Sequence, residues 1–74
     1  MSVARVIEIS SISSQSFEDA IRQGIERANQ TLRNVESAWI KEQNVMIQDG
    51  KITGFKVNMQ VTFVLDSSAG DAQM

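Results

Sequence analysis

The most regular pattern in the chain is an alternation of apolar and polar residues from Lys51 to Leu65. A period of two is typical of a strand with one buried face. The apolar positions are Phe55, Val57, Met59, Val61, Phe63 and Leu65, and the polar positions between them are Lys56, Asn58, Gln60 and Thr62. A second strand-like segment, Glu36 to Gln48, precedes it, and Asp49-Gly50 joins the two. Asp-Gly between strands predicts a two-residue type I′ hairpin turn, in which both residues need positive φ.

The first half of the chain predicts one strand and one helix. Val3 to Ile9 is rich in β-branched residues and free of Gly and Pro, which favours a strand. Five serines between Ser10 and Ser16 predict a loop, because their hydroxyls compete for backbone hydrogen bonds. The loop should end at a helix N-cap, Ser13 or Ser14, and the helix should run from about Ser14 to Leu32. Apolar residues at spacings of three and four form its stripe: Phe17, Ala20, Ile21, Ile25, Ala28 and Leu32.

These elements predict an α+β fold in the order strand, helix, strand, strand. A helical crossover makes the first two strands parallel, and the hairpin makes the last antiparallel to its neighbour. Placing the last strand in the centre gives a three-stranded antiparallel sheet packed on one helix. Gly24, on the apolar stripe, indicates a close approach of helix to sheet. The alternation slips near Gln43, which predicts a bulge or a change of face after that residue and a hairpin tip that projects toward a neighbouring chain. Residues 1–66 form the predicted domain, and residues 67–74 a flexible polar tail.

The sheet face without a helix is predicted to be polar around one large aromatic side chain. If no bulge intervenes, pairing across a two-residue turn places Ala38 and Ile40 on the helix side. The opposite face then carries Ser37, Trp39 and Lys41 beside Thr62, Gln60 and Asn58. An exposed Trp ringed by amides and hydroxyls suits stacking against a flat ligand. The same Trp39 also suits a subunit interface, where Trp is enriched, and both interpretations stay open.

Composition narrows the possible chemistry. The 74-residue chain contains neither Cys nor His, so it can build no disulfide, no thiolate metal site and no Ser-His or Cys-His nucleophile pair. An enzymatic role is therefore the weakest hypothesis. A net charge of −2 argues against nucleic acid, and no apolar run approaches the roughly 18 residues of a membrane span. The lack of Cys and of an N-terminal apolar run favours the cytoplasm. A lone core of this size supplies only about 3–5 kcal/mol, so we expect a symmetric homo-oligomer.

Four segments of the chain match one known family in order and spacing. They are Arg5-Val6-Ile7-Glu8-Ile9, the helical pattern from Ala20-Ile21 to Thr31-Leu32, the turn Asp49-Gly50-Lys51-Ile52, and the strand from Val57 to Phe63. Over about residues 3 to 66 the chain resembles the dodecins. The resemblance implies a hollow shell of twelve identical subunits that stores flavins such as FMN or riboflavin, is not an enzyme, and in some bacterial members also binds coenzyme A.

The chain departs from the dodecin pattern at the flavin site. In the simplest alignment, the flavin-stacking Trp position falls on Ser37, and the Gln position that contacts the ring edge falls on Lys56. Trp39 lies two residues after Ser37, on the same strand face and about 6.6–6.8 Å away. The resemblance therefore implies a cofactor site made of Trp39, Ser37, Lys56 and Gln60, with no catalytic and no metal-binding residues.

A second hypothesis is a dodecin-like shell that has lost flavin and serves another small ligand, calcium or a structural role. Some family members without the stacking Trp resemble this chain and are associated with calcium. Calcium needs six to eight oxygen ligands. Glu36, Glu42 and Asp49 are candidate ligands, and ordinary surface charge is the competing interpretation for each.

Overall fold

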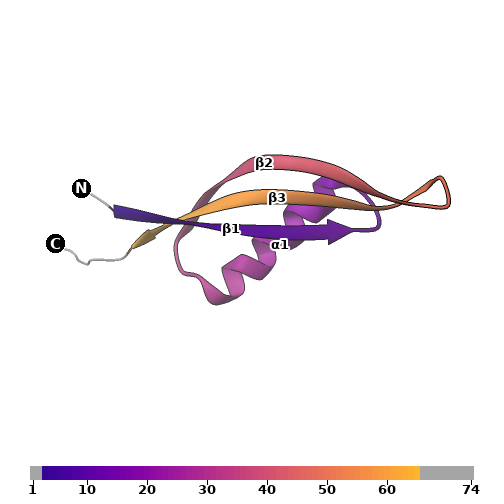
Figure 1. The fold of residues 1–74 in the computed structure, drawn as a ribbon. Helices are drawn as coiled ribbons and strands as arrows, with labels where there is room; N and C mark the ends of the chain where they lie inside the picture. The colour runs from indigo at the N-terminus through magenta and orange to yellow at the C-terminus, as the bar shows by residue number, and fades with distance from the viewer. Residues whose placement is uncertain (1–2, 66–74) are drawn as a thin grey trace.

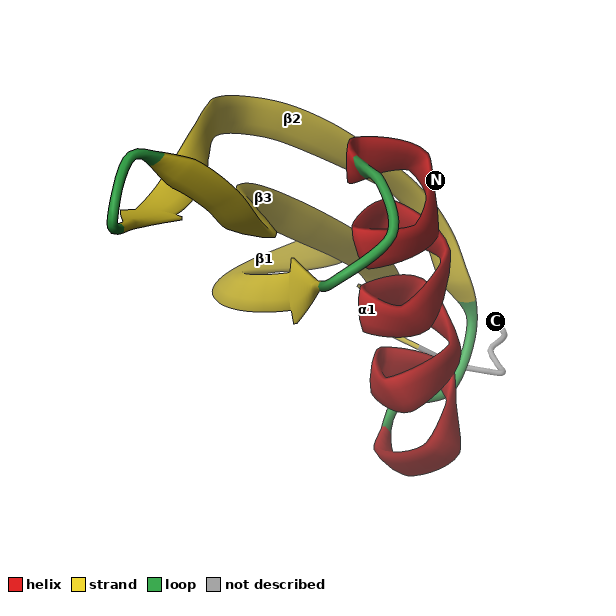
Figure 2. Ribbon diagram, turned by 90° about the vertical axis from the view of Figure 1, so that its right-hand side faces the viewer, coloured by secondary structure: helices red, strands yellow, loops and turns green. Residues whose placement is uncertain are grey.

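Three long strands and one helix make up the fold in the computed structural model, which describes residues 3–65. The elements are β1 (Val3–Ser13), α1 (Phe17–Thr31), β2 (Val35–Gln48) and β3 (Lys51–Leu65). The strands lie in the order β1-β3-β2, and β3 is antiparallel to both neighbours. Helix α1 covers one face of the sheet (Figures 1 and 2). The predicted α+β class, element order and strand order are confirmed, whereas the predicted tail at 67–74 lies outside the described residues.

A small core joins helix α1 to the central strand β3. Its fully buried apolar residues are Ala20, Val57, Met59 and Val61. A Cβ added to Gly24 would lie 2.9 Å from Met59 Cε and 3.1 Å from Ser11 Cβ, which is too close for either contact to persist unchanged. Gly24 therefore lets the helix backbone lie against the sheet, as its place on the apolar stripe predicted.

The β2–β3 hairpin projects well beyond the helix. Asp49 has φ 54° and Gly50 has φ 76°, so both turn residues adopt the positive φ that a type I′ turn needs. The molecule measures 56 × 19 × 14 Å, and the hairpin forms one end of its long axis (Figure 1). Exposed apolar side chains lie near this tip: Met46, Ile47 and Ile52. The predicted projection is confirmed, and its packing on a neighbouring chain stays a prediction.

The first strand is longer than the sequence predicted. β1 continues to Ser13 rather than ending at Ile9. The added residues pair in register with β3, and Ser10 Oγ donates a hydrogen bond to Asn58 Oδ1 at 2.6 Å. A partner strand thus supplies the hydrogen bonds that we expected the serines to make locally. The predicted serine-rich loop shrinks to residues 14–16.

Helix α1 is correspondingly shorter, Phe17–Thr31 in place of the predicted Ser14 to Leu32. Its N-cap is Ser16, whose Oγ accepts a hydrogen bond from the Asp19 backbone N–H at 2.9 Å. The prediction of Ser13 or Ser14 as the N-cap is wrong, because the chain leaves the sheet only after Ser13. A cap residue must come directly before the first helical turn.

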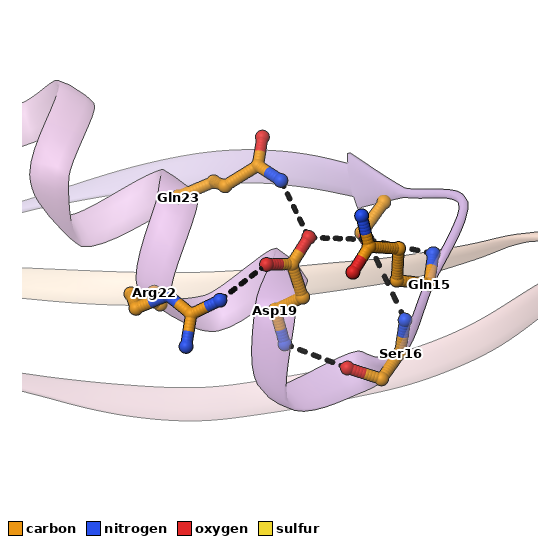
Figure 3. Close-up of polar contacts among 6 residues, drawn as sticks. Gln15, Ser16, Asp19, Arg22 and Gln23 are labelled. Carbon is orange, nitrogen blue, oxygen red and sulfur yellow. Dashed lines mark hydrogen bonds and ion pairs between the residues drawn. The ribbon is translucent and has the colours of Figure 1, made fainter.

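The buried carboxylate of Asp19 ties the end of β1 to the start of α1 (Figure 3). It accepts hydrogen bonds from Ser13 Oγ at 2.6 Å, from Arg22 Nη2 at 2.6 Å and from Gln23 Nε2. The Ser13 hydroxyl also accepts from the Gln15 backbone N–H at 2.9 Å. The bond donated by Ser13 is the main reason that the pKa of Asp19 lies below its ordinary 3.8; burial opposes this shift, while Gln23 and Arg22 reinforce it.

Replacing Gly50 tests the hairpin turn. We expect Gly50→Val to lower the free energy of unfolding by about 1–3 kcal/mol, because a β-branched residue resists positive φ. A Cβ at this position meets nothing within 4 Å, so the loss would come from the backbone alone. Denaturant titration at fixed protein concentration measures it. Gly50→Asn, which tolerates positive φ, is the matched control and should lose less; a Val variant as stable as wild type would contradict the turn assignment.

The lowered pKa of Asp19 predicts a pH-dependent contribution to stability. Because the folded chain binds the Asp19 proton less readily than the unfolded chain, the contribution is complete above the ordinary pKa and fades as pH falls through the lowered one. Asp19→Asn should therefore be less stable than wild type at pH 7, and the gap between their thermal midpoints should narrow below about pH 4. Glu18→Gln, an exposed change in the same helical turn, is the control. A gap that stays constant from pH 7 to pH 3 would disprove the link.

Candidate functional site

The sheet face opposite α1 gathers the residues that the sequence singled out around Trp39. The Trp39 side chain is 73% exposed, and Trp39 pairs directly with Gln60 on β3. Ser37 pairs with Thr62, one alternate position along the same face. The register predicted from the Asp-Gly turn is correct here, so the structure brings Trp39, Gln60 and Ser37 together.

Lys56 occupies the same face but a distant part of it. It lies between Asn44 of β2 and Ile12 of β1. Four residues of extended strand separate it from Gln60, which corresponds to about 13 Å, and six separate it from the partner of Ser37, about 20 Å. Ser37 and Lys56 are the two positions that the resemblance assigns to flavin. Within one chain they lie too far apart to contact the same flavin ring.

A bulge in β2 changes the predicted pairing next to Trp39. Lys41 does not lie opposite Asn58, because the ladder shifts between Ile40 and Glu42 and it is Glu42 that pairs with Asn58. The predicted bulge exists, but it lies at Lys41, ahead of the expected position near Gln43. The extra residue leaves Lys41 without a partner in the ladder and adds Glu42 to the open face.

Two rows of polar side chains cross all three strands at this place. In the first, Trp39 of β2, Gln60 of β3 and Glu8 of β1 are direct neighbours. Lys41 Nζ reaches over this row to Glu8 Oε1, at 3.5 Å. We call these four residues the Trp39 row.

The second row is held together by hydrogen bonds. Ser10 Oγ donates to Asn58 Oδ1 at 2.6 Å, and Asn58 Nδ2 donates to Glu42 Oε1 at 3.1 Å. These bonds fix the Asn58 amide beside the Trp39 row. Ser10 and Glu8 were not among the site residues predicted from the sequence, although their alternation with Ile7 and Ile9 places them on the open face. The missing information was the register of β1 against β3, which no turn sets.

Other parts of the described chain offer no competing metal site. Among residues 3–65, no three Asp or Glu side chains lie close enough together to hold a metal ion, so Glu36, Glu42 and Asp49 do not form the cluster that calcium would need within one chain. A groove of about 530 Å³ lies between α1 and β1 and is lined partly by Ile7, Ile9, Ala28 and Leu32. It opens on the helix side of the sheet, away from Trp39. The one described helix is too short and too polar to cross a membrane.

Comparison with known proteins gives one consistent result. Dodecin from Streptomyces davaonensis is 38% identical with a TM-score of 0.84, over 88% of this chain and 96% of that one. Dodecin from Streptomyces coelicolor is 28% identical with a TM-score of 0.84, over 88% and 93%. A calcium-chelating antigen of Mycobacterium tuberculosis, calcium dodecin, is 25% identical with a TM-score of 0.76, over 97% and 99%.

Curated protein sequences provide no match to this chain. The sequence model of the dodecin family, by contrast, matches residues 3–66. This match spans nearly the whole chain and covers every element of the fold. The chain therefore belongs to the dodecin family.

Proposed function

We propose that this chain is a non-catalytic, flavin-storing subunit of a cytoplasmic homododecamer, and that it holds an FMN- or riboflavin-type ligand against Trp39. The observation that carries the proposal is the indole of Trp39, which is 73% exposed and lies directly beside the polar side chain of Gln60. An indole in water gains by covering its apolar ring with another flat ring, and a flavin ring system supplies one.

The neighbours of Trp39 suit the edge of a flavin. The polar edge of the isoalloxazine carries carbonyl acceptors and an N–H donor. Gln60, directly beside Trp39, presents an amide that both donates and accepts. Ser37 is small and leaves room along β2 on the same face. Trp39 and Gln60 would thus take over in one chain the stacking and edge-reading roles that the resemblance assigns to Ser37 and Lys56.

The displaced site should bind less tightly than a site with the family's own Trp. Well-placed aromatic stacking contributes about 0.5–1.5 kcal/mol beyond the buried area. Losing its best placement therefore weakens binding by about one order of magnitude or less. Storage, in which a ligand must be released again, is compatible with such an affinity.

Assembly is supported by how little the single chain buries. Its core consists of a few residues between α1 and β3, while large apolar side chains stay exposed at the hairpin tip, among them Met46, Ile47 and Ile52. Covering these side chains with another copy of the chain would remove apolar surface from water. The proposed shell thereby adds the stability that a core of this size lacks.

One alternative is a shell that binds calcium in place of flavin. It is favoured by the similarity to the calcium dodecin of Mycobacterium tuberculosis, whose alignment covers 97% of this chain. Since residues 3–65 of one chain hold no cluster of three carboxylates, the oxygen ligands would have to come from more than one subunit. Coenzyme A is a further possible ligand that the resemblance implies, and mass spectrometry of small molecules released from the purified protein would detect it.

The number of subunits can be measured directly. Light scattering coupled to size exclusion should give about twelve times the chain mass of 8.2 kDa. We expect the chains to associate because association buries the exposed apolar side chains of the hairpin tip between copies. A folded monomer at micromolar concentration would rule the shell out.

Titration tests flavin binding at Trp39. FMN and riboflavin should lose fluorescence when wild-type protein is added, because stacked indole quenches an excited flavin. Trp39→Ala should bind at least about tenfold more weakly, and Trp39→Phe, which keeps a ring, should fall between the two. Equal quenching by wild type and Trp39→Ala would place the flavin elsewhere. If neither quenches while calcium titration gives heat, the calcium-binding shell replaces the proposal.

A further inference from the structure

The ion pair between Glu8 and Lys41 stands at one end of the Trp39 row. Lys41 Nζ and Glu8 Oε1 are 3.5 Å apart, and the side chains are 49% and 50% exposed. A pair this long and this exposed to water contributes little to stability. It can therefore open to admit a third group without a large cost to the fold.

The pair lies within reach of a ligand stacked on Trp39. Trp39 and Glu8 are separated by the width of β3, two inter-strand spacings or about 9–10 Å. Lys41 is unpaired in the ladder because of the β2 bulge, and its side chain already crosses Gln60 toward β1. A substituent that is attached to a ring stacked on Trp39 and extends over Gln60 would contact both Glu8 and Lys41.

The hydrogen-bonding capacity of the two groups determines which substituent fits. A lysine ammonium only donates and a carboxylate only accepts. A hydroxyl does both, so it can donate to Glu8 while it accepts from Lys41. A phosphate ester accepts from Lys41 but is repelled by Glu8 and, in the next row, by Glu42. The carboxylates of Glu8 and Glu42 and the ammonium of Lys41 together carry a local charge of about −1. Lys56 lies about 13 Å from Gln60 along β3, so it is too far away to offset this charge.

We propose that the Glu8–Lys41 pair selects the side chain of the ligand, and that it favours a flavin with an uncharged polyhydroxylated chain over the phosphate ester of the same flavin. This inference rests on the proposed function, and it assigns a specificity role to two residues outside the flavin positions that the family resemblance implies. The site would therefore prefer riboflavin to FMN.

The test compares three ligands with the same ring: riboflavin, FMN and lumichrome, which has no chain. Wild-type protein should bind riboflavin about fivefold more tightly than FMN, the ratio expected from an interaction of about 1 kcal/mol at half-exposed groups. Glu8→Gln should bring the two dissociation constants to within about twofold, because it removes the repulsion but keeps the shape. Lys41→Met should weaken FMN more than lumichrome. Glu18→Gln, an exposed change of the same kind on the helix, should leave every constant unchanged.

The outcomes separate this inference from the proposed function. If riboflavin binds but Glu8→Gln leaves its ratio to FMN unchanged, the specificity role is wrong and the flavin site stands. FMN binding more tightly than riboflavin in wild type overturns the inference in the same way. If none of the three ligands binds wild type, both proposals fall. Added salt gives an independent check, since screening should reduce the riboflavin-to-FMN ratio in wild type and not in Glu8→Gln.

Discussion

The sheet, the core and the candidate site all depend on the central strand β3, which forms hydrogen-bonded ladders with both other strands. Its odd-numbered residues from Val57 to Val61 are fully buried under α1, so one face of the sheet is committed to the core. One helix cannot cover both faces of a three-stranded sheet. The second face must therefore meet solvent, a ligand or another subunit, and on that face β3 supplies the polar residues Asn58 and Gln60. A single alternation thus specifies both the core and the site.

The parts of this arrangement that could be predicted are those set by neighbouring residues. Asp49-Gly50 forces a two-residue turn, and counting from that turn gives the pairing of Trp39 with Gln60. The count holds because the register shift between Met46 and Ile47 is cancelled by the shift between Ile40 and Glu42. The alternation of β3 and the helical stripe gave the core, and Gly24 gave the close contact with the sheet. Each of these inferences needs only residues close together in sequence, or one turn.

The parts that failed depend on contacts between residues far apart. The serines at the end of β1 looked like a loop because their competing partner, β3, is more than forty residues away, as the Ser10–Asn58 bond illustrates. With that partner in place, the N-cap moves to Ser16. Glu8 was overlooked for the same reason, since a helix and a hairpin intervene between β1 and its partner strand and leave its register open. A bulge in β2 was predicted, but its position at Lys41 was not, because that position also depends on contacts between residues far apart in the sequence.

The bulge at Lys41 has a consequence for the behaviour of the protein in solution. β2 is an edge strand, and a long regular edge offers evenly spaced N–H and C=O groups to any other strand that comes near. Shifts between Val35 and Ser37 and between Ile40 and Glu42 interrupt that spacing, and a charged residue stands at the second shift. Uncontrolled sheet extension between copies is thereby disfavoured. The same irregularity that shapes the Trp39 row therefore makes β2 a poorer template for edge-to-edge aggregation.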